Sequence, residues 1–217
     1  MTTSGTKTFT LDVADLIEEA YERIGQEVTT GYDAKTARRS LNLMISEWSN
    51  RGVHLWTVKQ EALPLVQGEA QYALPASVVD ILDMVLHRDG VDIDMNRISR
   101  TEYLNFPNKD QQGRPSQFYF ERKIAPVINL WQTPDRSTDK LVFYSVNRID
   151  DAGNFTNTVE VPFRFYPALV AGLAYYLAIK RDPMRVQILK PIYEEEMARA
   201  VSEDTDRVPL RLVPGMY

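Results

Sequence analysis

The sequence contains no cysteine and only two histidines among its 217 residues. Without cysteine the chain has no disulfide framework, no thiolate nucleophile and no sulfur-ligated metal site. His54 and His87 are too few for a histidine-rich zinc site, and we interpret them as structural residues in preference to catalytic bases. A glycine-rich phosphate-binding loop of either standard kind is also missing. These absences favour a non-enzymatic protein with no catalytic residue, no bound metal and no cofactor.

Long apolar runs and an excess of basic charge are missing as well. Residues 1–8 are polar and hold no apolar signal stretch. The longest uncharged run, which contains Tyr166 to Ile179, is too short to span a bilayer. The formal net charge of −5 argues against a broad basic face that grips nucleic acid. We therefore expect a protein that folds in a reducing, cytosolic setting.

Pairs and runs of carboxylates are present, but a solvent-exposed surface explains each of them more simply than metal binding or acid–base catalysis. Asp92 and Asp94 could hold a metal ion, yet they lack the further ligands that a hard cation needs, and a solvated strand explains them better. Glu194, Glu195 and Glu196 spread around a helix, so we favour a solvated face over an acid–base pair.

The aromatic residues and the one pair of adjacent arginines also allow two interpretations. Stacking on single-stranded bases is possible, but basic residues are not concentrated beside the rings, so we favour packing in a core or an interface. The aromatic residues concerned are Trp48, Trp56, Phe118, Phe120 and Trp131. Arg38 and Arg39 are typical of an exposed helix face, and a salt bridge between subunits is the alternative.

Two amphipathic helices are predicted near the N-terminus. Thr10 is placed to cap the first helix and Gly25 to end it, while the second runs from about Asp33 to just before Gly52. Apolar residues recur at spacings of three and four on one face of each helix. These are Val13, Leu16, Ile17, Ala20, Tyr21 and Ile24 in the first, and Ala34, Ala37, Leu41, Met44, Ile45 and Trp48 in the second.

Between Val53 and Val161 short apolar or alternating runs replace the helical pattern. Turn sequences rich in Gly, Asp and Pro separate these runs, which predicts an antiparallel barrel or sandwich. One short helix, Arg100 to Leu104 behind Ser99, interrupts them, and the polar stretch from Asn105 to Ser116 is long enough for a mobile loop. The predicted strands are Leu55–Val66, Gln71–Leu74, Ile81–His87, Gln117–Glu121, Val127–Trp131 and Lys140–Val146.

Helical patterns return after Val161. The run from Ala168 to Ile179 is apolar on nearly all sides, which predicts a buried helix whose small residues let neighbours approach closely. Asp182 and Pro183 are placed as N-cap and first position of a last helix, which Pro191 would bend. Its inward stripe is Val186, Leu189, Tyr193, Met197, Ala200 and Val201.

The predicted fold class is therefore α+β. Helix pairs from both ends of the chain, residues 10–52 and 162–203, form a helical bundle. Residues 53–161 form an inserted antiparallel β domain, a barrel or a sandwich. Residues 204–217 hold two prolines and form an extended C-terminal tail.

Four groups of motifs follow one another between about Val13 and Val201. In order they are LNLM (41–44) with EW (47–48) and GVHLW (52–56); QG (67–68) with YALP (72–75); RP (114–115) with FY (118–119) and INLWQTP (128–134); and VPF (161–163) with LVAGLA (169–174). In order and spacing they resemble the head–tail adaptor family of short-tailed, podovirus-like phages, known as tail tubular protein A or packaged-DNA-stabilisation proteins. Gln132-Thr133 stands where that family has a tighter proline pair.

The resemblance implies a structural protein of the virion neck. Such adaptors assemble as a homo-dodecameric ring beneath the phage portal protein, and their distal surface receives a tail nozzle or the next tail protein. Double-stranded DNA would pass through the channel without sequence-specific binding, and no small-molecule substrate is implied. The acidic balance fits such a channel, because a wall that grips phosphates would hold back the DNA.

The C-terminal residues are the candidate partner-binding segment. They have no helical stripe, and their apolar side chains have no obvious place in a monomer. Segments of this kind commonly order on a partner, as an added strand or in a groove. We expect this segment to dock on the portal through Val208, Leu210, Leu212, Val213, Met216 and Tyr217.

Three other classes of protein fit the sequence less well. A head-completion adaptor of a long-tailed phage is usually smaller, and the large β insertion argues against it. A tail-associated cell-wall hydrolase needs two carboxylates held at a set distance in a cleft, and no pair in the sequence suggests one. A DNA-binding module is disfavoured by the acidic charge.

Overall fold

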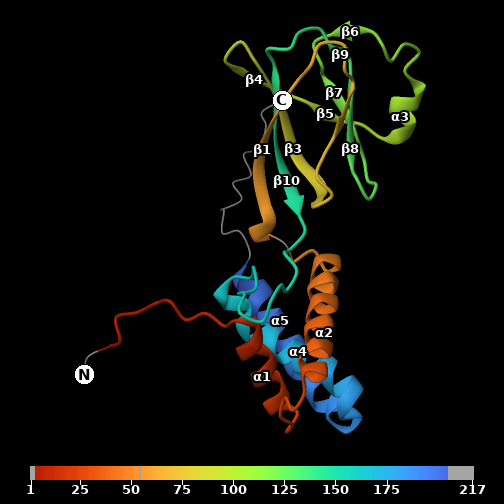
Figure 1. Cartoon of the computed structure of the whole chain (residues 1–217). Coiled ribbons are helices and arrows are strands. Elements are labelled where there is room, and N and C mark those ends of the chain that lie inside the picture. The colour runs from red at the N-terminus through yellow and green to blue at the C-terminus, as the bar shows by residue number, and fades with distance from the viewer. Residues whose placement is uncertain (1–2, 54, 205–217) are drawn as a thin grey trace, which may run out of the picture. The chain divides into compact units, whose positions relative to one another are not determined.

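A computed structural model describes residues 3–53 and 55–204 of the chain (Figure 1). The chain divides into two compact units. The first is built from the residues up to Val53 together with those from Ile149 onward, and the second from the residues between them, up to Arg148. Most helices thus belong to the first unit and the strands to the second.

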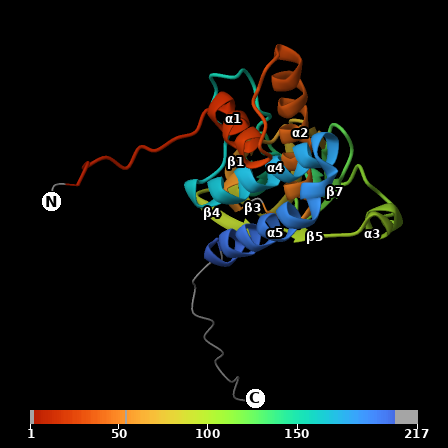
Figure 2. The same ribbon diagram turned by 90° about the horizontal axis from the view of Figure 1, so that it is seen from below.

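The first unit consists of helices drawn from both ends of the chain. Helix α4 contacts α1, α2 and α5, and it lies between α1 and α5 (Figure 2). The helices are α1 (Val13–Arg23), α2 (Gly31–Asn50), α4 (Tyr166–Arg181) and α5 (Val186–Glu203). Two 3-10 turns, η2 (Phe163–Phe165) and η3 (Pro183–Arg185), precede α4 and α5.

Local capping chemistry sets where α1 and α2 begin. The carboxylate of Asp12 accepts a hydrogen bond from the Asp15 amide at 2.8 Å, so Asp12 caps α1, and the predicted cap at Thr10 was wrong. Asp12 carries a side chain that reaches an unpaired first-turn amide, which Thr10 is too far upstream to do. Helix α2 begins earlier than predicted, because Thr30 and Asp33 form a reciprocal capping box.

The centre of the first unit is α4, and its burial confirms the prediction from its composition. Nine of its residues are buried, among them Gly172, where a side chain would clash with Met44 and Tyr193. The small residues of α4 therefore allow α2 and α5 to approach α4 closely. Trp48 is fully buried as predicted, with its ring 5.7 Å from that of Phe165, and its Nε1 donates a hydrogen bond of 2.8 Å to the hydroxyl of Tyr193.

The last helix also follows the predicted stripe in most positions. Leu189, Tyr193, Met197 and Ala200 are buried, whereas Val201 is 39% exposed. The helix proper starts after the 3-10 turn η3, so the predicted start at Pro183 holds only for that turn.

The second unit contains two four-stranded sheets. The first has the order β1-β10-β3-β4 and is antiparallel throughout. It is built from β1 (Val58–Pro64), β10 (Lys140–Asn147), β3 (Val78–Arg88) and β4 (Val91–Asp94). The second has the order β2-β8-β7-β5 and is built from β2 (Gln71–Ala73), β8 (Val127–Trp131), β7 (Gln117–Glu121) and β5 (Asn96–Arg97).

Smaller elements complete the second unit. Strand β5 pairs with β7 in parallel, and β6 (Gln112–Gly113) pairs in parallel with β9 (Thr133–Pro134). A 3-10 turn, η1 (Leu55–Thr57), precedes β1. Helix α3 (Arg100–Asn105) is capped by Ser99, as predicted.

The antiparallel sheets were predicted correctly, but the barrel alternative was wrong. Neither four-stranded sheet closes on itself, because the first ends at β1 and β4 and the second at β2 and β5. Strands β2 and β5 contain only three and two residues, which is too short to carry a continuous hydrogen-bond ladder around a barrel. Both sheets contribute to one core, which contains Leu65, Tyr72, Leu74, Val78, Ile81, Met84, Leu86, Met95, Phe118, Phe120, Ile128, Leu130, Leu141 and Phe143.

A buried ion pair joins the end of β3 to the loop between β9 and β10. Arg88 Nε lies 2.7 Å from the carboxylate of Asp139, and only 2% of Asp139 is exposed. The guanidinium also contacts Asp135. Arg88 is followed by Asp89 and Gly90, which both have positive φ and make the two-residue turn of the β3–β4 hairpin.

Candidate functional site

The polar residues that the sequence singles out form local surface contacts. His87 Nδ1 lies 2.6 Å from a carboxylate oxygen of Asp92, its partner across the β3–β4 hairpin. Asp94 is the last residue of β4, the strand that also contains Asp92. Within the described residues no group of three His, Cys, Asp or Glu side chains is arranged to hold a metal ion.

The three consecutive glutamates of α5 are engaged with arginines. Both carboxylate oxygens of Glu194 accept from Arg51, at 2.7 and 3.0 Å, and these hydrogen bonds lower the pKa of Glu194. Glu195 and Glu196 contact Arg199 one turn further along the helix. The three carboxylates are thus used in ion pairs between and along helices.

The aromatic residues for which packing was favoured over stacking on bases divide into buried and partly exposed groups. Phe118 and Phe120 belong to the core of the second unit, so their rings are not available to a nucleic acid. Trp131 is half-buried and stacks on Phe106, with ring centroids 4.1 Å apart and planes 1° apart. The indole of Trp131 also donates to the carbonyl oxygen of Asn108 at 3.4 Å.

The polar segment after α3 is held in place by hydrogen bonds to its backbone carbonyl oxygens. Lys109 Nζ donates to the carbonyl oxygens of Leu104 and Phe106, and the Thr133 hydroxyl donates to the Lys109 carbonyl at 3.0 Å. The stretch from Asn105 to Ser116, which was expected to be a loop, also contains the short strand β6. Its parallel partner β9 is too short to give a periodic signal in the sequence.

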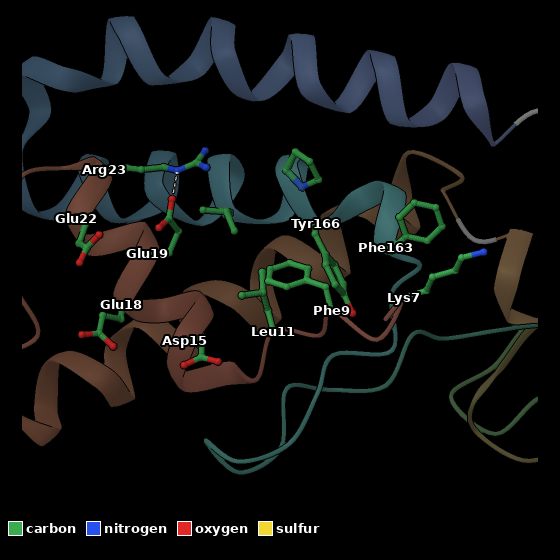
Figure 3. Close-up of a pocket in the computed structure, with 12 residues that line it drawn as sticks. Lys7, Phe9, Leu11, Asp15, Glu18, Glu19, Glu22, Arg23, Phe163 and Tyr166 are labelled. Atoms are coloured by element: carbon green, nitrogen blue, oxygen red, sulfur yellow. Dashed lines mark hydrogen bonds and ion pairs between the residues drawn. The ribbon is translucent and has the colours of Figure 1, made fainter. Parts of the chain in front are cut away.

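An open groove of about 750 Å³ lies beside α1 in the first unit (Figure 3). We refer to it as the α1 groove. Its walls come from the N-terminal segment, from α1, from η2 and from the start of α4. The lining residues are Lys7, Phe9, Leu11, Asp15, Glu18, Glu19, Glu22, Arg23, Phe163, Tyr166, Pro167 and Val170.

One end of the α1 groove is aromatic and unusually exposed. The ring of Phe9 meets that of Tyr166 edge to face, 6.3 Å between centroids. Phe9 is nevertheless 73% exposed and Phe163 77% exposed. Large apolar side chains this exposed, gathered in one depression, are typical of a surface that binds a partner.

The other side of the α1 groove is acidic. Asp15, Glu18 and Glu22 recur at spacings of three and four, so they lie on one face of α1, as Figure 3 shows. Glu19 pairs with Arg23 at 3.0 Å. In the described part of the chain the other three carboxylates have no ion pair or side-chain hydrogen bond, which leaves their charge free for a partner.

No pattern in the sequence predicts this groove. Phe163 belongs to the motif VPF (161–163), which gives it no place in a groove, and Phe9 belongs to no motif. Those two phenylalanines lie far apart in the sequence, and only the folded chain brings them together. The apolar spacing of α1 did indicate which face is buried, and therefore which face carries the carboxylates.

The structure places the paired arginines Arg38 and Arg39 but does not describe the C-terminal candidate residues. Arg38 is engaged within its own unit, because it donates to the carbonyl oxygen of Gly153 at 2.8 Å and its guanidinium lies over the ring of Phe155. Arg39 is exposed. The predicted portal-docking residues Val208, Leu210, Leu212, Val213, Met216 and Tyr217 lie outside the described residues.

The family model described as SU10 adaptor protein matches residues 11–213, a span that includes both units. A comparison with curated protein sequences gives no match. Among the described helices, none is long and apolar enough to cross a membrane.

Proposed function

The chain belongs to the SU10 adaptor protein family, and we propose that it is a structural connector between the head and the tail of a phage. The observation that carries this proposal is the family match over residues 11–213, because it extends through both the helical unit and the β unit. The role is non-enzymatic and requires no metal or cofactor. The protein would be made in the host cytoplasm and would act in the neck of the virion.

In this role the chain forms a ring below the portal, and the resemblance to short-tailed phage adaptors favours twelve copies. The ring would help to retain packaged DNA and leave a channel for its ejection. Duplex DNA would pass without sequence-specific contacts, and the formal charge of −5 per chain supports a channel that does not hold phosphates. The distal surface would receive a nozzle or the next tail protein.

The features of an interaction protein support the proposal. The α1 groove combines exposed aromatic rings with unpaired carboxylates, which suits recognition of another protein. In addition, Val208, Leu210 and Leu212 belong to the segment that we propose to dock on the portal. A head-completion adaptor of a long-tailed phage would use similar surfaces and remains the second candidate; the partner at the distal face distinguishes the two.

Co-sedimentation of the purified full chain with portal rings of the phage that encodes it tests the proposal. We expect the chain to pellet with the portal and to bind with a defined ratio of subunits. A portal from an unrelated phage is the control for nonspecific binding. Recovery of the chain in the supernatant at concentrations well above micromolar would contradict the proposed function.

A further inference from the structure

The outward face of α2 has the charge opposite to that of the α1 groove. Tyr32, Lys35, Arg39 and Leu43 recur at spacings of three and four, so they share one face of the helix. Tyr32 is 72% exposed and Leu43 57% exposed, and Lys35 and Arg39 are exposed between them. We refer to these four residues as the α2 face. It is apolar at both ends and basic in the middle.

The two cations of the α2 face are not used within the subunit. In residues 3–53 and 55–204 neither Lys35 nor Arg39 makes an ion pair or a side-chain hydrogen bond. Neighbouring arginines of the same unit behave differently, since Arg38 binds a backbone carbonyl and Arg181 binds Asp33. The α2 face therefore offers positive charge and apolar area to a partner.

We propose that the α1 groove of one subunit binds the α2 face of a second copy of this chain. The argument for this occupant is complementarity of charge and spacing. Glu18 and Glu22 are four residues apart, as are Lys35 and Arg39, so on both helices the charges are separated by about 6 Å along the axis. Two opposite-charge pairs can then form at once between α1 and α2 of neighbouring copies.

The apolar residues fit the same arrangement. Tyr32 or Leu43, at the ends of the α2 face, would reach the aromatic end of the groove, where Phe9 and Phe163 are exposed. Burying these side chains removes apolar area from water, while the exposed charge pairs mainly set register and partner choice.

The contact joins two different surfaces, so it is heterologous and repeats around a ring when its rotation closes. This inference rests on the proposed function, because it supplies the subunit contact of the proposed ring. Both surfaces belong to the first unit, so the contact does not depend on the second. A single contact of this size is weak, and the ring is stabilised when each subunit makes two of them.

Charge reversal tests the contact. The groove variant Glu18→Lys with Glu22→Lys and the helix variant Lys35→Glu with Arg39→Glu should each weaken self-association at least about tenfold, which is about 1.4 kcal/mol. The variant that carries all four changes should recover it, because the charges are again opposite. Lys190→Glu, on the exposed surface of α5, is the control and should associate like the parent. Sedimentation velocity from micromolar to submillimolar protein measures the association, and circular dichroism confirms that each variant folds.

Cross-linking gives an independent measurement, because the parent chain has no cysteine. A mixture of the Glu22→Cys and Arg39→Cys proteins, treated with a short bis-maleimide, should give a cross-linked heterodimer. A mixture in which Lys190→Cys replaces Arg39→Cys should not.

Three outcomes would overturn the inference. Parent-like association of both charge-reversal variants would do so, and so would equal cross-linking in the two mixtures. The third is a helix variant that changes binding to duplex DNA but not self-association, which would assign Lys35 and Arg39 to nucleic acid. If the chain binds the portal while the variants associate like the parent, the proposed contact is refuted and the proposed function stands. If the chain does not bind the portal while the variants lose and regain self-association as expected, the proposed function alone is refuted.

Discussion

Replacing Trp48 by alanine should destabilise the helical unit more than almost any other single substitution. Trp48 is fully buried, packs against Phe165 and donates its indole hydrogen bond to Tyr193. Truncation of a buried aromatic side chain to alanine typically costs about 3–5 kcal/mol, from lost apolar burial and from the cavity left behind. Because a domain of this size is stable by about 5–15 kcal/mol, the loss takes a large fraction of the total.

The conservative change separates packing from hydrogen bonding. Trp48→Phe keeps most of the apolar volume but removes the N–H donor, so it should cost about 1–2 kcal/mol. The Tyr193 hydroxyl keeps one partner, because it can still donate to Glu47 at 3.3 Å. Combining Trp48→Phe with Tyr193→Phe should then cost less than the sum of the single changes, since both remove the same hydrogen bond.

Urea unfolding followed by circular dichroism at the helical wavelength is the suitable assay, because the long helices all belong to the first unit. We expect the midpoint to fall strongly for Trp48→Ala and slightly for Trp48→Phe. We also expect the Trp48→Ala protein to be poorly soluble. If Trp48→Ala unfolded at the parent's midpoint yet failed to assemble, the residue would belong to an interface and the account of the helical core would be wrong.

Four further predictions follow from the structure and the sequence. Arg88→Met should destabilise the β unit by about 3–5 kcal/mol in urea melts, because it leaves the Asp139 carboxylate buried without its partner, and a second change, Asp139→Asn, should recover part of the loss. Hydrogen bonds from Thr30, together with Arg181, hold the pKa of Asp33 below its usual value of 3.8. This carboxylate therefore stabilises the fold above that pH and stops doing so as the pH falls through its folded-state pKa, so acid melts of Asp33→Asn should show a weaker dependence on pH than the parent. Deletion of the chain from Arg207 onward should leave the melting curve unchanged and abolish co-sedimentation with the portal; unchanged binding would refute the docking role of this segment. At low micromolar concentration the isolated chain should sediment as a monomer, and a stable ring without the portal would contradict that expectation.

Much of the fold could be predicted because its signals are local. Helix α2 has a capping box, an apolar stripe and a glycine after its end, and strands β7 and β8 have the predicted bounds Gln117–Glu121 and Val127–Trp131. Alternation or a 3.6-residue period determines such elements within a few neighbouring residues.

Other elements depend on contacts that a local pattern does not contain. Strands β5, β6 and β9 have two residues each and exist only through their parallel partners, so the sequence around them indicates a turn or a loop. The choice between a barrel and open sheets is likewise decided by which edge strands pair, and that information is spread from β1 to β10.

The candidate interaction site shows the same division. Periodicity in α1 and α2 is sufficient to assign their exposed faces, including Glu18 and Arg39. It is not sufficient to show that Phe9 and Phe163, which are far apart in the sequence, line one groove beside the acidic face. Surfaces composed of distant segments become visible only in the folded unit.

Cryo-electron microscopy of the purified virion of the encoding phage tests the central claim most directly, since it shows both whether the chain is present and where. The account predicts a ring of density between the portal and the tail into which the helical unit and the β unit can each be fitted. A neck of the virion built entirely from other proteins, with this chain absent from the particle, would contradict the account.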